Sequence, residues 1–133
     1  MNHEFQNCIG ANIRSLSRVV DNYYRSCLRA FDITENQMTI LFTLNKMGKI
    51  EQGKVGDTLA LERSTVSRNI KLLEKKELIT RTSSYRPEIE LSTKGQKLVV
   101  ALIPEWKKVM DDLTNKIGTE SVSMIQELER KLK

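Results

Sequence analysis

The residues best suited to chemistry in this sequence are the serines and cations between residues 63 and 75. A helix that turns 100° per residue brings Ile70 and Leu73 within about 40° of Val66, so these three are expected to face a core. Hydroxyls and cations then share the opposite face, namely Ser64, Ser67, Arg68, Lys71 and Lys75. Arginine can bond both acceptors of a guanine edge, serine a base edge or a phosphate, and lysine a phosphate. The pattern therefore predicts a helix that reads the DNA major groove.

The net charge of the chain is concentrated in the same region. The 133 residues include 22 basic and 17 acidic side chains, which gives a formal net charge of +5. Residues 63–86 hold seven of the basic residues and two of the acidic ones, so the rest of the chain is neutral. A basic segment on a neutral body is typical of nucleic-acid-binding proteins. On charge alone, the alternative is a solvated helix face rich in lysine.

Two shorter helices are expected to precede and position the basic helix. Thr34 and Gln37 have the spacing of a capping box, which predicts a helix start, and Gly48 is a typical helix end. The buried face of this helix is expected to carry Met38, Leu41, Leu44 and Met47. A second helix is predicted over residues 52–59 and, after a short turn, the basic helix over residues 64–76. Two helices joined in this way form a helix-turn-helix.

A β-hairpin is expected after the basic helix. The apolar period changes to two, with strands predicted over residues 78–82 and 88–91 and a turn over residues 83–87. Tyr85 and Arg86 lie in that turn, from which an arginine can reach the minor groove or the DNA backbone. A hairpin that follows a helix-turn-helix makes a winged helix-turn-helix, so the pattern predicts this DNA-binding fold.

Long helices are expected on both sides of the winged lobe. One apolar stripe runs along the first of them, through Ile9, Ile13, Leu16, Val20, Tyr23 and Cys27. Its spacing is typical of a coiled-coil seam, which suggests packing against a second chain. Ser92 or Thr93 can cap another helix, which Pro104 is expected to kink and Gly118 to end before a last helix begins at Thr119.

The predicted fold is mostly α, with a small β-hairpin wing. Aromatic residues make up only 5% of the chain and there are two prolines, which argues against a β-rich fold. We expect one domain over residues 1–133, with dimerisation helices at 1–31 and 96–133 around a winged lobe at 34–92. Since no apolar run is long enough to span a membrane and no leader pattern is evident, a cytoplasmic location is expected.

The sequence resembles the MarR family of multiple-antibiotic-resistance regulators over nearly its whole length. The segments that carry the resemblance are ITENQ at 33–37, LERSTVSR at 61–68, LEKKELI at 73–79 and LSTKG at 91–95. The resemblance implies a homodimer on a palindromic operator of double-stranded DNA. It also implies repression that a small-molecule effector or an oxidant relieves. The DNA-contacting residues would be Arg63, Ser64, Thr65, Ser67, Arg68, Lys71, Lys75, Tyr85 and Arg86.

The chain departs from the family pattern at two turns and in the wing. Ala60 and Glu77 stand where the family commonly has glycine, so local differences are expected there. In the wing, Ser83 and Tyr85 stand where the family usually has an aspartate and an arginine. We therefore expect Arg86, one position later, to make the DNA contact of the wing.

Two cysteines raise the question of redox control. Cys8 and Cys27 are 19 positions apart on one expected helix, about 28 Å, so a disulfide within that helix is excluded. The resemblance implies a possible peroxide sensor made of Cys8 near Tyr23 and Tyr24 of a partner chain, although Cys8 lies about two positions before the sensing cysteine of such relatives. A helix start favours a thiolate there. Cys27 lies on the apolar stripe and is expected in the core.

Other classes of function find little support in the sequence. His3 is the only histidine, and with two distant cysteines it forms no zinc motif, so neither metal nor cofactor is expected. No phosphate-binding glycine loop or nucleophile motif is present, which argues against an enzyme. Trp106 and the methionines suit a core, or alternatively a pocket for a small apolar effector. A winged helix for protein docking is the main rival function, and an RNA-binding module, for which stacking aromatics are lacking, is a weaker one.

Overall fold

The computed structural model describes residues 4–83 and 85–133, so His3 and Ser84 of the expected turn lie outside the described residues. The chain divides into two compact units. One unit comprises Met1–Ser26 with Pro104–Lys133, and the other is Cys27–Ile103. The second unit, which holds the basic segment, is called the winged unit below.

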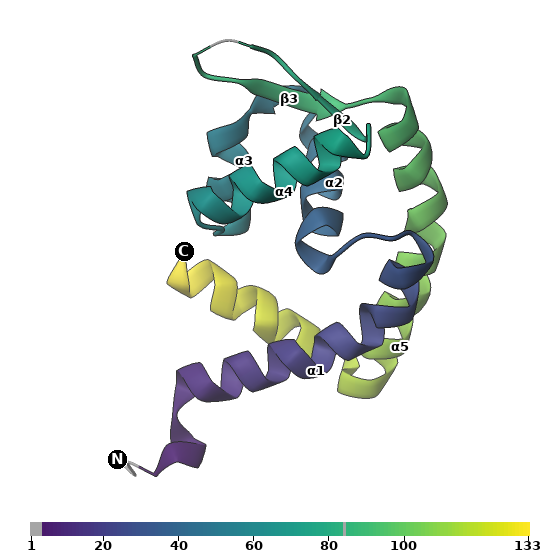
Figure 1. Ribbon diagram of the computed structural model, residues 1–133. Helices are drawn as coiled ribbons and strands as arrows, with labels where there is room; N and C mark the ends of the chain where they lie inside the picture. Colours follow the sequence, from purple (N-terminus) through teal and green to yellow (C-terminus); the bar gives the residue numbers. More distant parts are fainter. Residues whose placement is uncertain (1–3, 84) are drawn as a thin grey trace. The chain divides into compact units, whose positions relative to one another are not determined.

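The winged unit follows the expected order of elements (Figure 1). Its helices are α2 (Glu35–Met47), α3 (Gln52–Leu59) and α4 (Arg63–Lys75). Its strands are β1 (Ile50–Glu51), β2 (Ile79–Arg81) and β3 (Glu88–Leu91), which form an antiparallel sheet in the order β1-β3-β2. The predicted fold class is therefore confirmed.

Strand β1 is the element that the sequence analysis missed. Ile50 pairs with Ile89 of β3, on the edge of β3 opposite to β2. A strand of two residues is too short for a period of two to be recognised, and only its partner makes it a strand. The hairpin thus becomes a three-stranded sheet, and β1 leads directly into α3.

The core of the winged unit was largely predicted. The fully buried side chains of the unit include Ile40, Leu41, Leu44, Val55, Ile70, Leu73 and Ile89. The prediction for Met47 was wrong, because this last residue of α2 is 45% exposed. Gly48 ends the helix immediately after it, with a φ of 74°. The predicted capping box is confirmed, since Gln37 donates its backbone N–H to Thr34 Oγ1 and accepts from the Thr34 backbone through Oε1.

The other unit contains the first part of the long helix α1 (Ile9–Ala30) and the last part of the long helix α5 (Thr93–Leu132). A short 3-10 helix precedes α1 at Phe5–Asn7. The backbone of α5 is non-helical at Gly118, where the sequence predicted one helix to end and another to begin. No helix in the described residues is both long and apolar enough to cross a membrane.

Two tyrosines of α1 hold the last part of α5 in this unit. Tyr24 Oη donates to Met110 Sδ at 3.0 Å, and Lys116 Nζ donates to Tyr23 Oη at 3.1 Å. The same ammonium lies 4.6 Å from the centre of the Tyr23 ring. Much of the apolar surface of both helices is left uncovered in a single chain, including Ile9, Ile13, Leu16 and Val19 of α1 and Met124, Ile125, Leu128 and Leu132 of α5.

Ala60 and Glu77, which replace expected glycines, both have left-handed backbones. The φ angles are 55° at Ala60 and 63° at Glu77. Beyond α4, Leu78 N–H bonds to Leu73 O at 3.0 Å and Glu77 N–H to Glu74 O at 2.9 Å, which is the Schellman arrangement. The backbone therefore keeps the conformation that glycine favours, although a side chain is present.

Replacement of Glu77 by glycine is expected to stabilise the protein by about 0.5–1 kcal/mol, because a left-handed conformation costs a side-chain-bearing residue about 1–2 kcal/mol. The midpoint of urea denaturation measures this effect. Glu77→Ala is the matched control, since it removes the same exposed carboxylate but keeps a Cβ. A midpoint for Glu77→Gly at or below that of Glu77→Ala would contradict the expectation.

Candidate nucleic-acid interface

Helix α4 is held against the winged unit by the three apolar residues that the sequence placed on its inner face. Val66 is 3% exposed, and Ile70 and Leu73 are fully buried. The start of α4 also lies close to α3, because a Cβ on Gly56 would be 3.2 Å from both Leu61 O and Val66 Cγ2. This packing fixes which face of α4 points to solvent.

The predicted reading residues of α4 lie mostly on that outer face. Side chains that are exposed belong to Arg63, Ser64, Arg68, Lys71 and Lys75. Thr65 and Ser67 are half-buried, one on each flank of the helix. The wing residues Tyr85 and Arg86 are both exposed, Tyr85 at 97%. The structure thus brings the α4 residues together on one accessible surface.

The structure also shows which cations of the basic segment form ion pairs, whereas the sequence gives only their number. Lys76 Nζ lies 3.6 Å from a carboxylate oxygen of Asp32, and Arg81 lies 3.5 Å from that of Glu74. By contrast, within the described ranges no carboxylate forms an ion pair with Arg63, Arg68, Lys71 or Lys75. These four cations, all on α4, are the ones available to phosphates or base edges.

A polar network connects α4 to the start of α2. Gln37 is 3% exposed, and its Nε2 donates to Asn69 Oδ1 at 3.3 Å. Asn69 Nδ2 in turn donates to the Thr65 carbonyl of the preceding turn at 2.9 Å. The sequence identified Gln37 only as part of a capping box, and it identified no role for Asn69. Both residues connect α4 to α2, and the polarity of a buried Gln37 and a half-buried Asn69 on the inward sides of their helices is the signal that could have found them.

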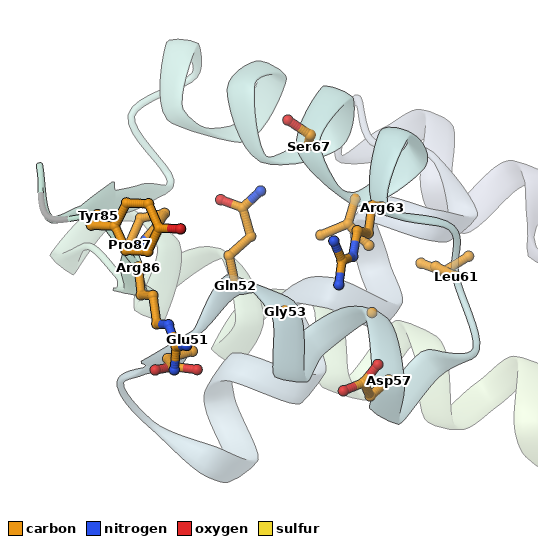
Figure 2. A pocket seen from close by; sticks show the side chains of 12 residues that line it. Glu51, Gln52, Gly53, Asp57, Leu61, Arg63, Ser67, Tyr85, Arg86 and Pro87 are labelled. Atoms are coloured by element: carbon orange, nitrogen blue, oxygen red, sulfur yellow. The ribbon is translucent and has the colours of Figure 1, made fainter.

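A groove of about 660 Å³ lies between α3, the start of α4 and the wing. Figure 2 shows the side chain of Gln52 projecting between Tyr85 and Pro87 of the wing and Arg63 of α4. Gln52 Oε1 is buried without a hydrogen-bond partner among the described residues. Ser67 lines the same groove from α4. Gln52 is thus a polar residue of this surface that sequence reasoning missed.

The residues of the possible redox sensor are not assembled within one chain. Cys8 is exposed at the start of α1, where its Sγ accepts the Ala11 N–H at 3.5 Å. Tyr23 and Tyr24 lie at least 15 residues further along the same chain, roughly 22 Å at the rise of a helix. Their hydroxyls bond to α5 residues instead. Cys27 is 8% exposed, as expected for a core residue.

Comparison with known proteins shows which family this arrangement resembles. Residues 33–86, which run from the start of α2 to the wing, match the MarR family. Over these residues the chain is similar to the MarR family. A Bacillus subtilis relative, the HTH-type transcriptional regulator YhbI, is 26% identical over 105 residues, which cover 76% of this chain and 68% of YhbI.

Solved structures of MarR-like regulators share the fold over almost the entire chain. S. aureus MepR in a complex with DNA has a TM-score of 0.80 at 26% identity, and 97% of each chain is covered. Bordetella bronchiseptica BpsR, described with regulation of its DNA binding by 6-hydroxynicotinic acid, has a TM-score of 0.87 at 18% identity, with 99% of this chain and 98% of BpsR covered.

These similarities indicate the broad class of the protein. The family match, the HTH-type regulator YhbI and the DNA complex of MepR support a DNA-binding transcriptional regulator, which is the broad class that the sequence predicted. No group of three or more metal-binding side chains occurs among residues 4–83 and 85–133.

Proposed function

We propose that this chain is a MarR-type cytoplasmic repressor that binds a palindromic operator as a homodimer. In this proposal α4 enters the major groove, Arg68 with Ser64 and Ser67 reads base edges, and Lys71 and Lys75 hold phosphates. The wing, with Tyr85 and Arg86, lies along the adjacent backbone or minor groove. The two copies of α4 meet major grooves about one helical turn, roughly 10 base pairs, apart.

One observation carries the proposal, namely the face of α4 on which Arg63, Arg68, Lys71 and Lys75 have no ion pair with any described carboxylate. Such a face suits a polyanion. A protein-docking surface would expose aromatic or aliphatic anchors instead. Selection of bound fragments from genomic DNA, followed by footprinting, tests the proposal. A protected palindrome with two half-sites supports it, and a single protected half-site contradicts the dimeric mode.

Dimerisation is expected from the apolar surface that a single chain leaves exposed. Leu16 of α1 is 63% exposed, so Leu16→Glu should leave the chain folded but convert a dimer of 15.3 kDa chains into a monomer. Sedimentation at micromolar concentration measures the change. Asn22→Glu is the control, because it adds the same charge on the opposite side of α1. A wild-type protein that sediments as a monomer would refute the dimer.

Relief of repression by an oxidant is one of two proposed modes of control. Cys8 supports it through its exposure and its place at the start of α1, where its Sγ accepts the Ala11 N–H. An organic hydroperoxide is expected to release DNA from the wild type but not from Cys8→Ser, as measured by fluorescence anisotropy of labelled operator. Cys27→Ser is the matched control. Equal release from the wild type and Cys8→Ser would remove Cys8 from the mechanism.

Relief by a small apolar effector is the other mode, and the relative BpsR supports it by analogy. Failure of hydroperoxide to release DNA from the wild type would favour this mode.

A further inference from the structure

The apolar contacts of α4 do not by themselves fix its rotation about the helix axis. Val66, Ile70 and Leu73 form one buried stripe along the helix. Burial of apolar surface is non-directional, so such a stripe keeps α4 against the core but tolerates a small roll of the helix. Hydrogen bonds are directional, and a chain of them reaches α4 on one flank of this stripe.

This chain of hydrogen bonds runs from the backbone at the start of α2 to the backbone of α4. The Thr34 N–H donates to Gln37 Oε1 at 3.2 Å, and Gln37 Nε2 donates to Asn69 Oδ1 at 3.3 Å. Asn69 Nδ2 then donates to the Thr65 carbonyl at 2.9 Å. Because a backbone N–H only donates and a carbonyl only accepts, the two ends of the chain determine which atom of each amide faces which neighbour. An amide at each of the two positions completes the chain.

The last bond of the chain lies in the turn of α4 that carries Arg68. Asn69 follows Arg68 directly, and its bond to the Thr65 carbonyl spans residues 65–69. Asn69 is half-buried, and both polar atoms of its amide bond within the protein. Its amide therefore acts on this turn of α4 and not on DNA.

We propose that Gln37 and Asn69 are positioning residues that fix the rotation of α4 and thereby set how accurately its outer face reads bases. The effect on base reading rests on the proposed function, whereas the effect on α4 does not. A bidentate bond between arginine and guanine requires both groups to be aligned, so a small roll of α4 weakens it. Lysine binds a phosphate as a point charge on a flexible stem and tolerates such a roll. Loss of the chain should therefore reduce operator preference more than it reduces binding to DNA in general.

The rotation of α4 is tested without DNA by residual dipolar couplings of the backbone N–H groups, with α2 as the reference. Asn69→Leu and Gln37→Met remove the amides but keep similar side-chain volumes, and both are expected to change the couplings over residues 63–75. Thr43→Val is the matched control, because Thr43 is also buried but its hydroxyl donates to the Thr39 carbonyl within α2. Couplings of α4 that stay as in the wild type in both variants would overturn the proposal.

Base reading is tested separately with the full chain, the selected operator and an unrelated duplex at one salt concentration. Asn69→Leu and Gln37→Met are each expected to lower the ratio of the two dissociation constants at least about fivefold, the low end of what one bidentate base contact contributes. Thr43→Val should leave the ratio unchanged. Equal losses of affinity for both duplexes would overturn the effect on base reading. A wild type without operator preference would instead contradict the proposed function, on which the dipolar couplings do not depend.

The double variant Gln37→Met with Asn69→Leu separates positioning from stability. Asn69→Leu alone leaves the amide of the buried Gln37 without its acceptor, whereas the double variant replaces both polar partners, which can be nearly neutral for stability. The urea midpoint of the double variant is therefore expected to exceed that of Asn69→Leu, while its operator preference stays as low. Recovery of operator preference together with stability would show that the chain acts only through stability, and would overturn the proposal.

Discussion

Replacement of Gly95 by alanine is expected to destabilise the winged unit by on the order of 3 kcal/mol. A Cβ on Gly95 would lie 2.0 Å from the carbonyl oxygen of Leu78 and 3.0 Å from the carbonyl carbon. Both atoms belong to the backbone, so no rotation of a side chain can relieve the clash. The same carbonyl accepts the Ser92 N–H at 3.0 Å, and Ser92 Oγ caps α5 by accepting the Gly95 N–H at 3.0 Å. The start of α5 would therefore have to move away from the segment that joins α4 to β2.

Urea denaturation followed by circular dichroism measures this loss. Gly53→Ala is the matched control, because a Cβ on Gly53 of α3 meets nothing within 4 Å. Alanine in a helix is favoured over glycine by roughly 0.5–1 kcal/mol, so the control should be slightly more stable than the wild type. A Gly95→Ala protein as stable as Gly53→Ala would show that the close approach of Gly95 to Leu78 is absent in solution.

Replacement of Arg68 by alanine is expected to cost roughly 1–3 kcal/mol of operator binding and to relax base preference at one position in each half-site. Arg68 is exposed on the outer face of α4 beside Ser64, and no described carboxylate pairs with it. The guanidinium is therefore free to make a bidentate bond to guanine. Titration of labelled operator and of single-base variants at fixed salt measures affinity and preference together.

Lys75→Ala is the control that separates phosphate binding from base reading. It should weaken binding to all sequences about equally. The dependence of log K on log salt should become shallower by about 0.9 for each phosphate that is no longer neutralised, and a dimer leaves two such phosphates, one in each half-site. If Arg68→Ala kept full affinity and preference, α4 would not be the reading element, and the protein-docking function would become the better explanation.

Features that depend on neighbouring residues were predictable from the sequence alone. The capping box of Thr34 and Gln37 and the helix breaks at Gly48 and Gly118 were all predicted and are present. So was the apolar face of α4. Each of these depends on interactions within about one or two turns, where spacing along the chain determines which groups meet.

Features that depend on contacts between distant segments were decided only by the tertiary structure. Strand β1 exists because Ile50 meets Ile89, and Gln37 is connected to α4 because α2 brings it to Asn69. The fold likewise determined which cations keep no partner and how closely Gly95 approaches Leu78. Composition gives the number of charges and of small residues, but their energies depend on distances to groups on other elements of the fold. Those distances are set by how the helices and the sheet pack around a shared core.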